Sequence, residues 1–146
     1  MSIFDKGGFR RKVNKIVKKL AEDGAAEAKT RYEAAIYDGN NDVSVKAEKT
    51  TDGYDIVASG ESVLFIEFGA GFREGYGHPQ AEEFGFGPGT WSEGPEGKGH
   101  WLDKDGWRIP GTGQKTYGNP PSMAMYRTAK EVRRNVPRVA SEVLHE

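Results

Sequence analysis

Apolar residues recur at helical spacing near the N-terminus. Phe9, Val13, Ile16, Val17 and Leu20 fall three or four positions apart, which places them on one face of a helix. The pattern resumes after Gly24 with Ala28, Tyr32 and Ile36. The sequence therefore predicts a helix over residues 5–38 that stops at the "DGNND" stretch, residues 38–42.

A second helical pattern lies near the C-terminus, over residues 121–145. Pro120-Pro121 suits a helix start, because the first amides of a helix need no partner within it. Pro137 falls inside the pattern and should bend the helix, since it cannot donate to the Arg133 carbonyl. The apolar face carries Met125, Val132, Val136, Val139 and Val143, with Thr128 and Ala129 filling the gap.

Between the helices, two segments alternate apolar and polar residues. "VSVKAEKT" (43–50) and "YDIVAS" (54–59) are typical of half-buried strands, and Asp52-Gly53 suits a type I′ turn between them. In that register Val45, Ala47 and Ile56 share a face. The following stretch "VLFIEFGAGF" (63–72) fits either a central strand or a short buried helix.

These elements predict an α+β fold in one domain, residues 1–146. A long N-terminal helix and a C-terminal helix would pack on a small antiparallel sheet. Within the domain, residues 70–119 form a Gly-rich and Trp-rich insertion, here called the arm. It holds all three tryptophans, Trp91, Trp101 and Trp107, and Asp105-Gly106 predicts a short β-ribbon over residues 100–109.

Charge is distributed unevenly along a chain whose net charge is only −1. The first twenty residues hold seven Lys and Arg against Asp5 alone, whereas residues 61–105 hold nine acids against three bases. A chain polarised in this way can attract an oppositely polarised copy of itself or an anionic partner at one end. No cysteine is present, which excludes disulfides and thiolate zinc sites. We expect neither a membrane span nor a secretion signal.

The glycine-rich stretches do not fit a cofactor site. "GFGPGT" (85–90) and "GTGQKT" (111–116) miss the spacings of phosphate-binding loops, and "DKDG" (103–106) places its glycine wrongly for calcium. A hydrolytic or metal site is conceivable at His78, His100, Glu82 and Glu83, but solvent-exposed loop residues are the favoured interpretation. No serine lies in a nucleophile-elbow context. We assign no catalytic, metal or cofactor residue.

Basic residues of the first helix suit contact with DNA phosphates, although a solvated helix face is the commoner outcome. The aromatics of the arm suit stacking on bases. The arm is acidic, however, and would repel a nucleic-acid backbone, so we expect its aromatics to insert into protein.

Two short motifs resemble a known family. The first is Glu67-Phe68-Gly69 at the end of an apolar run, followed by Ala70 and a Gly/Pro-rich insertion. The second is "YGNPPSMAMYRTAKEV" (117–132), with Pro120, Pro121, Tyr126 and Arg127 before the last helix. Together they resemble the small tail-component proteins of long-tailed bacteriophages, which act in tail completion or head–tail joining. Ser122 and Met123 depart from the Arg-Pro-Phe-like residues common in that family.

The resemblance implies a structural protein rather than an enzyme. Copies would form a six-fold ring in the virion neck, between the connector and the tail tube, after assembly in the host cytoplasm. Partners would be connector or head-completion, tail-terminator and tail-tube proteins, with DNA passing non-specifically through the channel and no membrane. Expected interface residues are Glu67, Phe68, Gly69, Trp91, Trp101, Trp107, Pro120 and Pro121; Lys12, Lys15 and Lys19 would line the channel.

Three alternatives stay open at this point. The nearest is a tail terminator or another structural protein of the tail or capsid. A small enzyme with a glycine-rich lid over His78 and His100, and a nucleic-acid-binding module built on the first helix, are less favoured.

Overall fold

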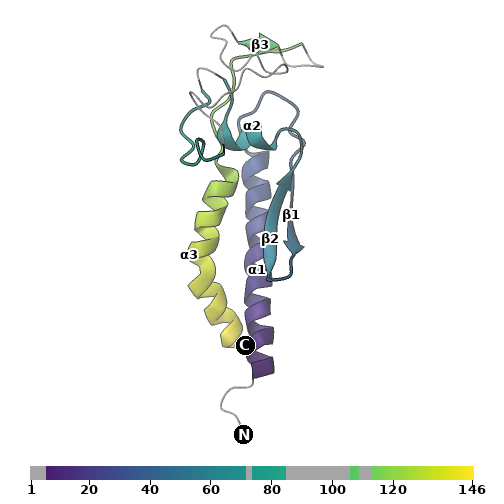
Figure 1. Cartoon of the computed structure of the whole chain (residues 1–146), viewed down its shortest axis with the longest axis vertical. Helices are drawn as coiled ribbons and strands as arrows, with labels where there is room; N and C mark the ends of the chain where they lie inside the picture. The colour runs from purple at the N-terminus through teal and green to yellow at the C-terminus, as the bar shows by residue number, and fades with distance from the viewer. Residues whose placement is uncertain (1–5, 72–73, 85–105, 109–112) are drawn as a thin grey trace. The chain divides into compact units, whose positions relative to one another are not determined.

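The computed structural model describes residues 6–71, 74–84, 106–108 and 113–146 (Figure 1). The fold is α+β, as the sequence predicts. Its elements are α1 (Lys6–Glu33), β1 (Ser44–Lys49), β2 (Tyr54–Ser59), α2 (Val63–Phe68), β3 (Trp107–Arg108), β4 (Lys115–Thr116) and α3 (Ala124–Leu144).

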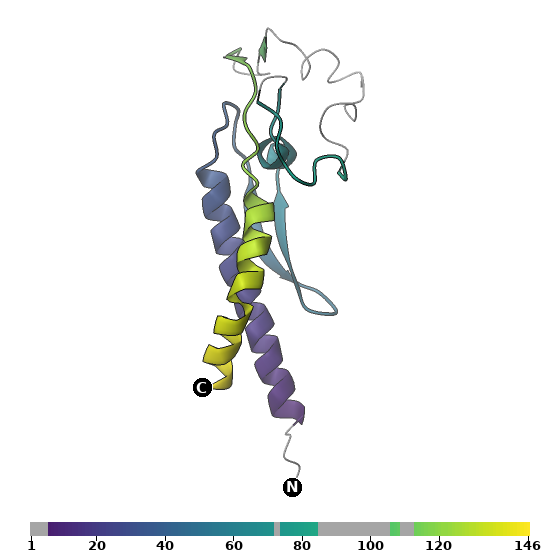
Figure 2. The ribbon, with the colours of Figure 1, turned by 90° about the vertical axis from the view of Figure 1, so that its left-hand side faces the viewer.

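Two compact units make up the chain. The helical unit comprises Met1–Thr30, Ser44–Ala58 and Met125–Glu146, and the junction unit comprises Arg31–Val43 and Ser59–Ala124. Within the helical unit, α1 and α3 run antiparallel beside each other and the β1–β2 hairpin lies along α1 (Figures 1 and 2). Small side chains line the seam between the helices, which lets the two backbones approach closely. The buried residues of this unit are Ala21, Ala25, Ala28, Thr128, Val139 and Val143.

Gly24 marks the point where α3 and the hairpin both press against α1. A Cβ atom at this position would lie 2.5 Å from Ile56 Cδ1 and 2.8 Å from Val132 Cγ2. Glycine costs an α-helix about 1 kcal/mol relative to alanine. The structure gives the reason for glycine here, because the Ile56 and Val132 side chains would have to move to make room for any larger residue.

The buried seam differs from the apolar face that the sequence predicts for α1. Phe9 is 53% exposed and Val13 37% exposed, and on α3 Val136 is 42% exposed. Ala28 and Tyr32 of the predicted face are buried, and so are Ala21 and Ala25, which the prediction did not include. Bulky side chains would hold two helices apart, so the closest contact forms where the residues are smallest.

The hairpin has the predicted strands but a different turn. The Thr50 amide donates to the Gly53 carbonyl at 2.8 Å, so the chain reverses through Thr51 and Asp52. A type I′ turn at Asp52-Gly53 would need positive φ at both residues, and neither residue has it. The predicted turn is therefore wrong by one residue. With the loop at Thr51-Asp52 instead of Asp52-Gly53, each strand residue pairs two positions away from its predicted partner. Side chains alternate between the two faces of a strand, so the apolar residues still share one face.

The first helix ends at Glu33, five residues before the predicted stop. The Tyr32 carbonyl accepts the Ala35 amide at 3.2 Å and the Asn41 side-chain amide at 2.9 Å. These contacts satisfy a carbonyl of the last turn, which otherwise lacks a donor. Residues 34–38 are therefore not helical, and Asn41 acts on the end of α1 rather than in a simple turn.

The 63–72 stretch, which the sequence left undecided, contains helix α2. Further along, β3 pairs antiparallel with β4, and Trp107 lies opposite Thr116. Most of the ribbon predicted at 100–109 lies outside the described residues. No described helix combines the length and apolarity needed to cross a membrane.

Candidate functional site

The two motifs that carry the family resemblance meet at one place in the junction unit. There the end of α2, residues 65–70, crosses residues 118–123, and we call this crossing the junction. The last carbonyl groups of a helix lack partners within it. In α2 they accept from the crossing segment: Asn119 Nδ2 donates to Phe65 O at 2.9 Å, the Ser122 amide to Ile66 O at 2.8 Å, and the Met123 amide to Glu67 O at 3.2 Å.

The backbones themselves are in contact at the junction. Ala70 and Asn119 exchange two N–H···O=C hydrogen bonds, each 2.9 Å long. Gly69 has a φ of +79°, and a Cβ atom there would lie 2.7 Å from Pro121 N. Gly118 has a φ of +101°, and its Cβ would overlap the Ala70 carbonyl. Both positions therefore require glycine, for backbone conformation and for space.

The crossing also explains why α3 begins later than predicted. Met123 has a φ of +54°, which is left-handed and ends any helical run that starts at Pro120-Pro121. The first helical residue is Ala124, whose amide lies 3.3 Å from Ser122 Oγ. The two prolines are thus part of the junction rather than the first turn of α3.

Glu67 lies at the centre of this unit and is only 5% exposed. The Tyr32 hydroxyl donates to Oε2 at 3.1 Å, and His78 Nε2 lies 3.0 Å from Oε1. The carboxylate therefore connects the end of α1, α2 and the segment around residue 78. A buried charge needs such donors, because transfer from water without them is costly.

The hydrogen bonds define the protonation of His78. The Gln80 amide donates to His78 Nδ1 at 3.0 Å, so Nδ1 carries no proton. We assign the neutral tautomer in which Nε2–H donates to Glu67. Burial raises the pKa of Tyr32 far above its usual range, and the charge of Glu67 and its hydrogen bond raise it further. Tyr32 thus keeps its proton at neutral pH.

Aromatic contacts extend from this centre. The Phe68 ring lies 4.3 Å from the His78 ring and 5.5 Å from the Phe84 ring, measured between centroids. Phe68 is buried, whereas Phe84 is 56% exposed. The segment around His78 is therefore fixed on α2 by one polar and one aromatic anchor. This chemistry positions segments of the chain relative to one another.

The position of His78 corrects the expectation of an exposed loop residue. It is 6% exposed, and its partner Glu67 is a residue that the metal or hydrolytic hypothesis did not include. Glu82 and Glu83 are exposed, and His100 lies outside the described residues. Within the described ranges, no three His, Asp or Glu side chains are grouped as a metal site would require.

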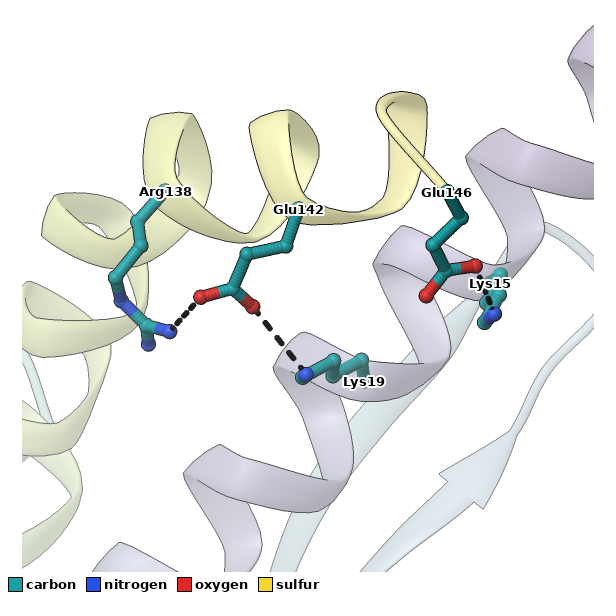
Figure 3. A network of polar contacts seen from close by, with 5 residues as sticks. All are labelled: Lys15, Lys19, Arg138, Glu142 and Glu146. Carbon is teal, nitrogen blue, oxygen red and sulfur yellow. Dashed lines mark hydrogen bonds and ion pairs between the residues drawn. The ribbon is translucent and has the colours of Figure 1, made fainter.

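Two of the lysines assigned to a DNA channel, Lys15 and Lys19, pair with carboxylates at and just beyond the C-terminal end of α3 (Figure 3). Lys15 pairs with Glu146, Lys19 Nζ lies 3.3 Å from Glu142 Oε2, and Lys12 Nζ lies 3.4 Å from Leu144 O. Arg138 first, and then Lys19, lower the pKa of Glu142. These cations already have partners within the helical unit, and their role toward DNA stays a prediction.

The remaining predicted interface residues are described only in part. Pro120 and Pro121 are half-buried at the junction, and Trp107 is described through its backbone in β3. Trp91 and Trp101 lie outside the described residues. Near β4, the buried Thr116 hydroxyl donates to Asp38 at 2.9 Å.

Sequence reasoning missed three residues that build the site. Asn119 caps α2, Thr116 ties β4 to the loop after α1, and Tyr32 reaches Glu67. The sequence marks Tyr32 only as an apolar position of a helix face. Asn119 has a weak signal, because asparagine before a proline favours a turn.

Comparison of the chain with protein-family models, with curated proteins and with solved structures gave no match in any of the three. Function is therefore inferred from the two motifs and from the junction that joins them.

Proposed function

We propose that the chain is a structural subunit of the head–tail neck or tail end of a long-tailed bacteriophage virion. In this role it acts in tail completion or joining. Copies assemble into a six-fold ring whose channel lets DNA pass. Ring closure uses one surface of each copy against a different surface of the next.

The observation that carries this proposal is the junction. The resemblance to tail-component proteins rests on two motifs about fifty residues apart in the chain, each too short to be specific alone. In the structure they form one feature, in which Gly69 packs against Pro121 and Asn119 caps α2. Two motifs that depend on each other are stronger support than two independent matches.

Exposed apolar side chains on the helical unit also support an assembling subunit. Phe9 is 53% exposed, Val136 42% and Leu144 45%. Scattered exposed apolar residues are normal in monomers, but they also provide contact area where subunits meet. The buried residues of this unit are few and small, so neighbouring copies would add substantially to its buried apolar area.

We propose further that the arm, residues 70–119, docks on a neighbouring subunit. In this proposal the ribbon at 100–109 presents Trp101 and Trp107, and Trp91 adds a third anchor. Tryptophan is among the residues that contribute most to interfaces. Burial of these rings would contribute apolar contact area to that interface.

The test is to detect the chain in purified virions. In a phage whose genome encodes this chain, mass spectrometry of purified particles should find it at roughly six copies per particle. Removing the gene should leave filled heads and tails unjoined in electron micrographs, and expression from a plasmid should restore joining. Absence of the chain from purified particles would exclude a structural role in the virion.

The arm has a separate test. The double variant W101A/W107A should retain the helical circular dichroism of the isolated chain but fail to enter particles. Loss of helical signal would instead identify the two tryptophans as core residues of the chain itself.

A further inference from the structure

The two compact units carry opposite net charges. The helical unit holds fifteen Lys and Arg against ten Asp and Glu, a net charge of +5. The junction unit holds six Lys and Arg against twelve Asp and Glu, a net charge of −6. The chain as a whole is close to neutral, so the polarity follows the division into units rather than reflecting an excess of one charge.

Much of the positive charge forms one line on α3. Arg127, Lys130, Arg134 and Arg138 follow one another at spacings of three and four, which places them on one helix face, here called the basic row. All four are exposed. The row lies on the side of α3 opposite the buried Val139 and Val143. The basic row is therefore exposed to solvent.

Half of the basic row has no acidic partner within the described part of the chain. Arg134 pairs with Glu131 at 3.0 Å and remains 73% exposed, and Arg138 pairs with Glu142 at 2.9 Å. Lys130 lies 4.7 Å from the centre of the Tyr126 ring, and Arg127 forms no ion pair with another described residue. The row thus has a surplus of positive charge that favours an anionic partner.

The junction unit carries a matching negative surface. In the segment of residues 74–84, here called the acidic segment, Glu74, Glu82 and Glu83 are exposed and form no ion pair within the described part of the chain. The segment is fixed to α2 through His78 and Phe84. Its carboxylates are therefore presented from an anchored backbone, which lowers the entropy cost of binding.

We propose that the basic row of one copy docks on the acidic segment of a second copy. The partner is a copy of this chain because the chain itself carries the complementary surface, at equal stoichiometry. Two different surfaces that match each other form a head-to-tail contact, and such contacts repeat from copy to copy. The closure of these contacts into a ring rests on the proposed function, whereas the contact itself does not.

Exposed ion pairs are individually weak and are screened by salt. Association through the basic row should therefore depend strongly on ionic strength. In sedimentation velocity, the full-length chain should form oligomers at 50 mM NaCl and lose them at 500 mM NaCl. We expect the apparent dissociation constant to rise at least about tenfold between the two conditions.

Charge reversal provides the decisive experiment. R127E/R134E cancels the net positive charge of the basic row, and E82K/E83K reverses the charge of the acidic segment. Each variant alone should remain monomeric at 50 mM NaCl. An equimolar mixture of the two should associate, because the unaltered acidic segment of the first variant complements the unaltered basic row of the second.

The matched control is K46E/K49E on β1. Both lysines are exposed, and the change alters the net charge by the same amount as R127E/R134E. This control should associate like the unaltered chain. Circular dichroism of every variant separates loss of association from loss of folding, and rescue in the mixture requires folded partners.

Three results would overturn the proposal. The unaltered chain shows no self-association at low salt; the reversed variants associate as well as the unaltered chain; or the mixture of reversed variants fails to associate. Gel shifts with duplex DNA test the competing hypothesis that the basic row binds nucleic acid. DNA binding that is lost in R127E/R134E and is not restored in the mixture would assign the row to nucleic acid instead.

The outcome is distinguishable from that of the proposed function. Charge-dependent oligomers of a chain that is absent from virions would support this contact and refute the neck role. Virions that incorporate R127E/R134E and E82K/E83K normally, at unaltered copy number, would refute this contact and leave the neck role standing.

Discussion

In the helical unit, α1 and α3 meet along alanine and valine side chains, whereas in the junction unit the chain crosses itself through backbone hydrogen bonds and a buried carboxylate. The first kind of contact is non-directional and depends mainly on the apolar area removed from water. The second kind depends on each donor facing its acceptor. The seam between α1 and α3 should therefore tolerate substitution, whereas the stability of the junction should depend on the positions of single donor and acceptor atoms. The variants below test that difference, from the largest expected effect to the smallest.

Gly118→Ala should have the largest effect. The added Cβ would overlap the Ala70 carbonyl, at a φ that alanine rarely adopts. We expect urea unfolding to show a loss of about 4 kcal/mol. The matched control is Gly77→Ala, where φ is +114° and no atom lies within 4 Å of the new Cβ. The control should lose only about 1 kcal/mol; equal losses would show that the junction is not tightly packed.

Glu67→Leu should lower the free energy of unfolding by about 3 kcal/mol, because it leaves two buried donors without an acceptor. Tyr32→Phe in the unaltered chain should cost about 1 kcal/mol. In the Glu67→Leu background the same change removes one stranded donor, so it should be neutral or stabilising. A double-mutant cycle measured by urea unfolding gives this difference directly. Additive effects would contradict the role assigned to Glu67.

Alkaline pH tests the same contact. Since the folded pKa of Tyr32 is raised, its contribution to stability is complete below pH 10 and is lost as the pH rises further. Each pH unit above 10 should cost about 1.4 kcal/mol while Tyr32 stays protonated in the folded state. Thermal unfolding between pH 8 and 11 should show this slope, and Tyr32→Phe should flatten it. Tyr37, whose pKa is raised by burial and by Asp42, provides the comparison variant Y37F, which should leave most of the slope.

Thr128→Val should stabilise the helical unit. Thr128 is 1% exposed, and its hydroxyl has no hydrogen-bond partner within the described part of the chain. Valine has the same shape without the hydroxyl, so we expect a gain of about 1 kcal/mol in thermal unfolding. Thr128→Ser keeps the hydroxyl and should not stabilise. A loss with valine would indicate a partner for the hydroxyl.

Lys19→Ala should have the smallest effect. Lys19 and Glu142 are both nearly half exposed, so their ion pair should contribute little to the free energy of unfolding. The effect should vanish in 1 M NaCl because salt screens exposed pairs. Urea unfolding of Lys19→Ala, Glu142→Ala and the double variant measures the coupling. A coupling above about 2 kcal/mol would mean that the helical unit also depends on specific polar contacts.

The sequence predicts the helical unit well because periodicity reports burial. Two helices and the hairpin strands follow directly from spacings of three, four and two. What it misjudges there is which side chains pack most closely: Phe9 and Val13 are exposed while the alanines are buried. Hydrophobicity alone does not indicate how near two backbones come.

The junction unit is far less predictable, because its contacts join residues distant in sequence. Nothing local to Glu67 indicates that Tyr32 and His78 will donate to it. The resemblance to tail-component proteins singled out Glu67, Gly69 and Pro121 without giving a physical reason. The structure supplies one for Gly69, where a Cβ would meet Pro121. The sequence misplaces the end of α1 because Asn41 donates to the Tyr32 carbonyl. It misplaces the start of α3 because Met123 has a positive φ. It misplaces the β1–β2 turn because the Thr50 amide donates to the Gly53 carbonyl.

The pairing of Ala70 with Asn119 has one more consequence. It joins the two ends of the stretch between these residues, and His78 and Thr116 anchor that stretch at two further points. The entropy of closing such a loop grows only with the logarithm of its length, about 0.6 kcal/mol for each doubling. The loop can therefore be lengthened, or exchanged for foreign sequence beyond its anchored residues, at little cost to the crossing. The stretch between Ala70 and Asn119 is therefore a place where a segment with a new recognition surface can be inserted without changing the rest of the fold.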